Sequence, residues 1–277
     1  MSNVFEIFDI RKYPLQTLNV NGAQIGYRIA GSGQPILLVT GYGATMDMWA
    51  PELLRVLAEN YQLIIYDNRG IACSTSGDSQ EFSIRLFADD AAKLLDGLGI
   101  KSVHILGWSM GTYIAQELAI NHPLLVDKLV LYAGGPGGEN SIPPEPAASA
   151  ALTDTSGTAA ERSARAFVSL FPAEWLKQNP NPLEFFPIPE IAAHPAVMEQ
   201  QFHALMSWSG SYSRLEQLKS EVLLITGTED IIVPPGNSRI IAEKLPTAWF
   251  VQIAGGGHGL MYQYPHKMAT VIRGFLE

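Results

Sequence analysis

Short apolar segments alternate with amphipathic segments along most of this 277-residue chain, and this alternation restricts the fold more than any other feature. Alternating strand and helix patterns predict an α/β fold with a mainly parallel sheet that helices cover on both faces. The first two strands flank the turn sequence Asn21-Gly22 and are expected to form an antiparallel pair. The expected strands are residues 17–20, 23–30, 35–39, 62–67, 103–108, 128–133, 221–226 and 248–253, and the expected helices are 48–60, 83–99, 109–122, 237–245 and 265–277.

The alternation stops after Ala133 and resumes near residue 221. Residues 134–163 are rich in Gly, Pro, Ser and Ala and are expected to be irregular, whereas residues 164–212 have helical spacing and many large apolar side chains. A structureless segment of this length is uncommon in a compact protein, so a helical insertion is expected. The sequence thus predicts the first part of the core in 1–133, a helical insertion in 134–215 and the second part of the core in 216–277.

Charge and composition exclude several classes of partner. The chain has 18 Lys and Arg against 27 Asp and Glu, and its net charge of −9 opposes binding to nucleic acid. It has no run of about 18 apolar residues and no basic, apolar leader, so no membrane partner is expected and a cytoplasmic location is predicted. Cys73 is the only cysteine, which excludes an intrachain disulfide and fits a reducing compartment. We expect Cys73 to be structural.

The sequence GWSMG, residues 107–111, lies where an expected strand meets an expected helix. A sharp turn there would hold the backbone of Ser109 in a strained conformation and project its hydroxyl, as in a nucleophile elbow. Gly107 and Gly111 lack Cβ atoms, so strand and helix can approach closely. The helix N-terminus and the Met110 N–H would then stabilise negative charge. Ser109 is therefore a candidate nucleophile; the alternative is that it only caps the helix.

With this motif in place, the sequence resembles the α/β-hydrolase fold family, in particular its serine hydrolases with a lid. The resemblance runs from about Leu18 to the C-terminus, except that the insertion shares only the position of a cap. Residues 67–74, DNRGIACS, resemble the family motif DxRGxGxS with Ala72 at the second glycine. The resemblance implies an α/β-hydrolase fold with a mostly parallel eight-stranded sheet, flanking helices and a helical cap domain.

The resemblance also implies a catalytic triad in the order Ser, acid, His. The family spacing GxxDxxxP places the acid at Asp230, although Glu229 could substitute on charge alone. The glycine-rich segment 255–259 places the base at His258, whose imidazole can accept and return a proton near neutral pH. His203 is the rival base to be tested. Asp230 would orient the imidazole and Ser109 would attack.

Two backbone amides are expected to form the oxyanion hole. Met110 N–H follows the nucleophile, and by resemblance Tyr42 N–H supplies the second donor. The family usually has His-Gly where this chain has Thr40-Gly41, which leaves open what braces the loop. The Tyr42 side chain could narrow the acyl site or offer a phenolic hydrogen bond.

The predicted function is a serine esterase that cleaves a small to medium, largely apolar carboxylic ester or lactone through an acyl-enzyme. The aromatic and methionine side chains of the insertion favour an apolar small-molecule substrate. No cofactor and no metal are expected. A serine at 109 argues against dehalogenases and epoxide hydrolases of this fold, which have an aspartate there. The alternatives are a C–C bond hydrolase acting on a ring-cleavage diketone, a cofactor-free perhydrolase or haloperoxidase, and a non-catalytic ligand receptor. The oligomeric state is not predicted.

Overall fold

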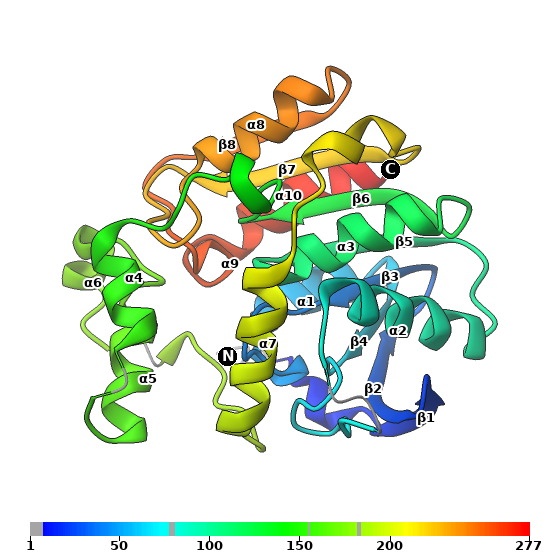
Figure 1. Ribbon diagram of the computed structural model, residues 1–277, viewed down its shortest axis with the longest axis horizontal. Coiled ribbons are helices and arrows are strands. Elements are labelled where there is room, and N and C mark those ends of the chain that lie inside the picture. Colours follow the sequence, from blue (N-terminus) through cyan, green and yellow to red (C-terminus); the bar gives the residue numbers. More distant parts are fainter. Residues whose placement is uncertain (1–7, 78–80, 155, 182–183) are drawn as a thin grey trace, which may run out of the picture.

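The computed structural model describes residues 8–77, 81–154, 156–181 and 184–277. Within these ranges eight strands form one sheet in the order β1-β2-β4-β3-β5-β6-β7-β8 (Figure 1). β2 is antiparallel to both neighbours and the other pairs are parallel, which confirms the predicted sheet. The strands are β1 (Gln16–Val20), β2 (Ala23–Gly31), β3 (Gln34–Val39), β4 (Tyr61–Tyr66), β5 (Val103–Trp108), β6 (Val126–Tyr132), β7 (Glu221–Gly227) and β8 (Trp249–Ile253).

Helices cover both faces of the sheet, and each face has its own hydrophobic core. Successive residues of one strand, such as Leu37 and Leu38 in β3, are fully buried in the two different cores. α2 and α3 pack on one face, and α1 and α10 pack on the other. The central strands, such as β3, β4 and β5, are largely apolar on both sides, as expected where helices shield both faces from water. The core helices are α1 (Pro51–Ala58), α2 (Ile84–Gly97), α3 (Met110–Asn121), α8 (Gly236–Lys244), α9 (Leu260–Gln263) and α10 (Pro265–Leu276).

Two expectations about helices need correction. The helix expected over 48–60 begins at Pro51, because the fixed φ of proline suits the first turn of a helix. The segment 134–163, expected to be irregular, contains α4 (Pro146–Thr153) and the start of α5 (Ala159–Val168). Alanine has the highest helix propensity, and the alanines of 147–151 outweighed the surrounding glycine and proline. None of the described helices is long and apolar enough to cross a bilayer.

The insertion carries α4, α5, α6 (Ala173–Gln178) and α7 (Pro195–Ser207), and in Figure 1 the first three of these helices lie to the left of α7. The chain leaves and re-enters the core at one place, where Ser211 N–H donates to Pro136 O at 2.7 Å. Gly137 and Gly210 have φ values of +69° and +89°, and a Cβ on Gly210 would lie 2.5 Å from Gly137 O. The two ends of the segment lie next to each other, as expected for an insertion into the core. Its boundaries at 134 and 215 remain a prediction.

A buried ion pair fixes the loop after β4 to helix α2. Arg69 donates from Nε and Nη2 to the two carboxylate oxygens of Asp90, each at 2.7 Å, and the two side chains are 0% and 2% exposed. Asn21 Nδ2 donates to the same carboxylate at 2.9 Å. Removing one partner of a buried pair leaves an uncompensated charge, which costs more than the pair itself contributes.

We expect Arg69→Met to lower the free energy of unfolding by about 3–5 kcal/mol, because Asp90 keeps its charge in a dry site. The double variant Arg69→Met/Asp90→Leu should recover most of that loss in urea denaturation. The control is Arg85→Met, which breaks an exposed pair with Asp89 and should cost less than about 1 kcal/mol. Equal losses for Arg69→Met and the control would contradict the assignment.

Asp67 makes stability depend on pH. It is fully buried and accepts from Met46 N–H at 2.7 Å and Cys73 N–H at 3.0 Å. Burial penalises the charged form more than these donors favour it, so the pKa of Asp67 is raised to about 6. Burial also raises the pKa of the Cys73 thiol to about 11, in keeping with a structural cysteine.

A raised pKa means that the folded state holds this proton more tightly than the unfolded state does. The stability that Asp67 contributes is therefore complete below about pH 4 and is lost as the pH rises towards about 6. We expect the unfolding free energy of wild type, minus that of Asp67→Asn, to fall by roughly 1–3 kcal/mol across this window. Urea denaturation at several pH values measures it, and a flat difference would contradict the raised pKa.

Candidate active site

Ser109 occupies a strained turn between β5 and α3. Its φ of +57° and ψ of −123° lie in a region that side chains other than glycine rarely adopt, at a typical cost of about 1–3 kcal/mol. The turn is fixed by Ser109 N–H, which donates to Tyr132 O at 3.0 Å, and by Ser109 O, which accepts from Thr112 N–H and Oγ1. The residue is half-buried. This is the sharp strand-to-helix turn that the sequence predicts.

The glycines on both sides of Ser109 are required by the packing. A Cβ on Gly111 would lie 2.1 Å from Val39 O, and a Cβ on Gly107 would lie 2.6 Å from Gly111 O. Both obstacles are backbone atoms, which cannot rotate away as a side-chain end can. The two glycines therefore allow α3 to pack against the ends of β3 and β5.

Asp230 and His258 lie in direct contact, although they are far apart in sequence. His258 Nδ1 is 2.8 Å from Asp230 Oδ2, and the residues are 3% and 2% exposed. A carboxylate oxygen accepts, so Nδ1 donates and Nε2 is the ring nitrogen left for another partner. Asp230 Oδ1 accepts from Ile232 N–H at 3.0 Å and Val233 N–H at 2.8 Å, which holds the carboxylate at the end of β7.

Tyr132, the last residue of β6, links the serine turn to the histidine loop. Its carbonyl accepts from Ser109 N–H, and its hydroxyl donates to His258 O at 2.5 Å. Trp108 stacks on Tyr132 and lies 6.1 Å, between ring centroids, from His258. Within the described part of the chain no hydrogen bond joins Ser109 Oγ to the imidazole, and such bonds often tighten only when substrate is bound. Sequence reasoning missed Tyr132, since nothing local distinguishes it from other core tyrosines.

The rival residues lie elsewhere. Glu229 is exposed, and its backbone N–H donates to Gly256 O at 2.8 Å. His203 is exposed on α7. Of the two acids and the two histidines, only Asp230 and His258 are buried and paired.

The loop after β3 faces the serine. A Cβ on Gly41 would lie 3.0 Å from Ser109 Cβ and 3.5 Å from Ser109 Oγ. Asn68 Nδ2 donates to Thr40 Oγ1 at 3.2 Å and to Thr40 O at 3.4 Å. The buried Asn68 thus braces the loop at the position where the family usually has a histidine. The sequence signal was its place beside Asp67 in the 67–74 motif, which sequence reasoning took to support the fold more than the chemistry.

The two amides expected to form the oxyanion hole each have an N–H available to donate. Met110 is the first residue of α3, so its N–H has no partner within the helix. Neither this N–H nor that of Tyr42 donates to an acceptor in the described ranges. The Tyr42 side chain is half-buried, burial raises its pKa, and its ring lies 6.1 Å from that of Phe202 on α7.

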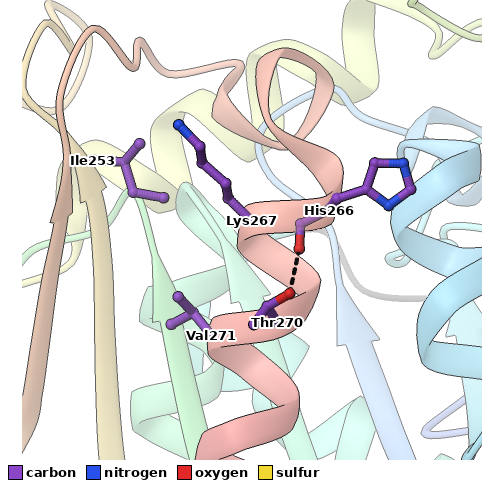
Figure 2. A pocket seen from close by; sticks show the side chains of 5 residues that line it. All are labelled: Ile253, His266, Lys267, Thr270 and Val271. Carbon is purple, nitrogen blue, oxygen red and sulfur yellow. Dashed lines mark hydrogen bonds between the residues drawn. The ribbon is translucent and has the colours of Figure 1, made fainter.

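A shallow hollow of about 420 Å³ lies on the exposed side of α10, and Figure 2 shows the five side chains that line it. His266, Lys267, Thr270 and Val271 come from α10, and Ile253 ends β8. No candidate catalytic residue lines the hollow. Across the described residues, no group of three or more His, Cys, Asp or Glu side chains could hold a metal ion.

Comparison with known proteins relates the chain to enzymes of one family. The family described as the alpha/beta hydrolase fold matches residues 34–265. A protein of Caulobacter sp. (strain K31) named "Putative carbamate hydrolase RutD" is 30% identical over 250 residues, which are 90% of this chain and 92% of that protein. A protein of the same name from Pseudomonas syringae pv. syringae (strain B728a) is 29% identical over 248 residues, or 87% and 93% of the two chains.

Solved structures share the fold at lower identity. A hydrolase from Pseudomonas aeruginosa PA01 superposes with a TM-score of 0.80 at 24% identity and covers 95% of this chain and 98% of its own. The enol-lactonase from Burkholderia xenovorans LB400 has a TM-score of 0.78 at 22% identity, with coverage of 94% and 99%. At these identities the structures establish a common architecture.

We expect Gly111→Ala to destabilise the protein by roughly 1–3 kcal/mol, because the added methyl would separate α3 from the end of β3. Gly274→Ala is the matched control: it lies in α10, where a Cβ meets nothing within 4 Å, and should stabilise by about 0.5–1 kcal/mol. Urea denaturation of both variants measures the difference. A Gly111→Ala protein as stable as wild type would show that the close approach is not needed.

Proposed function

The chain belongs to the α/β-hydrolase fold family, and on that premise we propose that it is a serine hydrolase that cleaves a small to medium, largely apolar carboxylic ester or lactone. The observation that carries the proposal is the buried 2.8 Å bond between His258 and Asp230, held by Tyr132 beside the strained turn of Ser109. A buried carboxylate on Nδ1 directs the basic lone pair of the imidazole to Nε2.

Acylation starts when Ser109 Oγ attacks the substrate carbonyl carbon and His258 Nε2 takes the hydroxyl proton. The carbonyl oxygen becomes an oxyanion that accepts from the Tyr42 and Met110 N–H groups. The C–O bond to the leaving group then breaks, and His258 returns the proton to the departing alcohol. Water repeats these steps on the acyl-enzyme, releasing the acid and restoring Ser109.

An apolar substrate is supported by the side chains that the insertion brings to the proposed oxyanion loop. The Phe202 ring lies beside that of Tyr42, and a Cβ on Gly43 would lie 2.9 Å from Met198 Cε. Such side chains accommodate uncharged acyl groups better than charged ones. We further propose that residues 134–215 act as a cap domain and that the protein works in the cytoplasm, as its single thiol and its composition favour.

A second candidate is carbamate hydrolysis, which the 30% identity to the Caulobacter protein named "Putative carbamate hydrolase RutD" favours. A carbamate carbonyl carries nitrogen in place of the acyl carbon, so the same nucleophile, base and oxyanion donors would act on it. The two candidates differ in the group next to the carbonyl and are separated by substrate preference.

We expect Ser109→Ala to lower kcat/KM for p-nitrophenyl esters by roughly 10⁴-fold or more, because no other group then forms the acyl-enzyme. The assay is a chain-length series of p-nitrophenyl acyl esters, with a p-nitrophenyl carbamate in parallel. Ser102→Ala, a change at an exposed serine before β5, is the matched control and should keep wild-type rates. A fluorophosphonate should label wild type and Ser102→Ala but leave Ser109→Ala unlabelled.

The outcomes separate the candidates. Higher kcat/KM on acyl esters supports the esterase, whereas higher kcat/KM on the carbamate supports the second candidate. Full activity in Ser109→Ala would refute a serine mechanism. A folded wild type that neither turns over any substrate nor reacts with the fluorophosphonate would favour a ligand receptor.

A further inference from the structure

The insertion makes a hydrogen bond next to three residues of the proposed catalytic machinery. Each bond involves the residue that directly follows Tyr42, Asp230 or His258. The bonds are Gly43 N–H to Gln201 Oε1 at 2.9 Å, Glu145 N–H to Ile231 O at 2.9 Å and Gly259 N–H to Leu170 O at 2.7 Å. The insertion therefore contacts the backbone of three of the proposed catalytic loops one residue after the functional position, although it supplies none of the proposed catalytic groups.

Among these three bonds, only the one to Gly43 is made by a side chain, so substitution can remove it. Gln201 lies on α7 and is fully buried. Its Nε2 is also buried and meets no acceptor in the described part of the chain. A buried amide with one group unpaired is costlier than an apolar side chain of the same size. Core packing alone therefore does not account for a glutamine here, whereas the bond to Gly43 does.

The loop that carries Tyr42 is held at both ends. Asn68 of the core bonds to Thr40 before it, and Gln201 of the insertion bonds to Gly43 after it. Gly43 has a φ of +64°, and because glycine adopts positive and negative φ values about equally readily, this conformation is not fixed by the residue itself. Without the bond from Gln201, the next hydrogen bonds after Thr40 would be those of Ala44 N–H to Gly41 O at 3.3 Å and of Met46 N–H to Asp67 Oδ1 at 2.7 Å. Within the described residues, Tyr42 and Gly43 between them would then have no bond of their own to hold them, and the direction of the Tyr42 N–H would be freer to vary.

We propose that Gln201 is a positioning residue: it holds Gly43 so that the Tyr42 N–H points at the developing oxyanion. The inference rests on the proposed function, because it assumes that Tyr42 N–H is an oxyanion donor. It also makes the oxyanion hole depend on α7, so that displacement of the insertion from the loop would release one of the two donors. Gln201 acts through the loop and does not touch the reacting atoms.

The test compares three variants of Gln201. Gln201→Met has no acceptor oxygen, and Gln201→Asn has one on a side chain too short to reach Gly43 N–H. Gln201→Glu keeps an oxygen that can accept from Gly43 N–H. We expect the first two to lower kcat for the best p-nitrophenyl substrate by about 10–100-fold with KM changed less than threefold, since losing a whole donor costs about 10²–10³. Affinity for a trifluoromethyl ketone, which forms the oxyanion, should fall by the same factor. Gln201→Glu should stay within about fivefold of wild type in kcat, given one retained acceptor.

Gln200→Met is the matched control on the same helix and should keep wild-type kinetics. Hydrogen exchange at the Gly43 amide gives a readout without activity: it should quicken in Gln201→Met and Gln201→Asn, but not in Gln201→Glu or Gln200→Met. Unchanged exchange in a folded Met or Asn variant, or kcat within twofold of wild type, would overturn the inference. If Ser109→Ala keeps full activity while exchange behaves as expected, the proposed function fails and the bond to Gly43 stands.

Discussion

The strained turn at Ser109 is the constraint on which the rest of the structure depends. The Ser109 backbone has a φ of +57° in a turn where α3 packs closely against the sheet. The packing is so close that Cβ atoms on Gly107 and Gly111 would collide with backbone oxygens. The buried central part of the sheet, with a hydrophobic core on each face, supplies the packing that offsets this strain. The regular sheet thus stabilises one of the few non-glycine residues with a positive φ among the described residues.

The parts of the site that the sequence predicts are those with local signals. The turn at Ser109 has glycines at fixed spacing between a strand and a helix, and Asp230 and His258 follow strands in an order typical of the family. Tyr132 and Gln201 had no such signal, and Asn68 had only its place in the 67–74 motif. The roles of these three residues come from contacts with residues 126, 158 and 28 positions away in the chain. In their local sequence, this asparagine, tyrosine and glutamine resemble many residues of the same type that have no role in a site.

The insertion, too, could be predicted from the sequence only in part. Its position and helical character follow from the interrupted strand pattern, but α4 was missed because glycine and proline around it obscure a short alanine-rich helix. What the pattern cannot give is where the insertion meets the core, since that depends on tertiary packing. Those contacts fall beside the proposed catalytic residues, at Gly43, Ile231 and Gly259.

The core and the insertion therefore hold different parts of the proposed site in place. The core fixes the groups that need the most exact geometry: the serine turn, the Asp230 carboxylate on its two amides, and the Tyr132 bridge. The insertion fixes the loops around them, and it also brings Phe202 and Met198 to the proposed substrate side. One helix, α7, thus carries both the side chains that would select a substrate and the glutamine that would align an oxyanion donor. If the proposed function and the role of Gln201 hold, substrate preference and turnover are coupled, and a change in the packing of α7 would alter both.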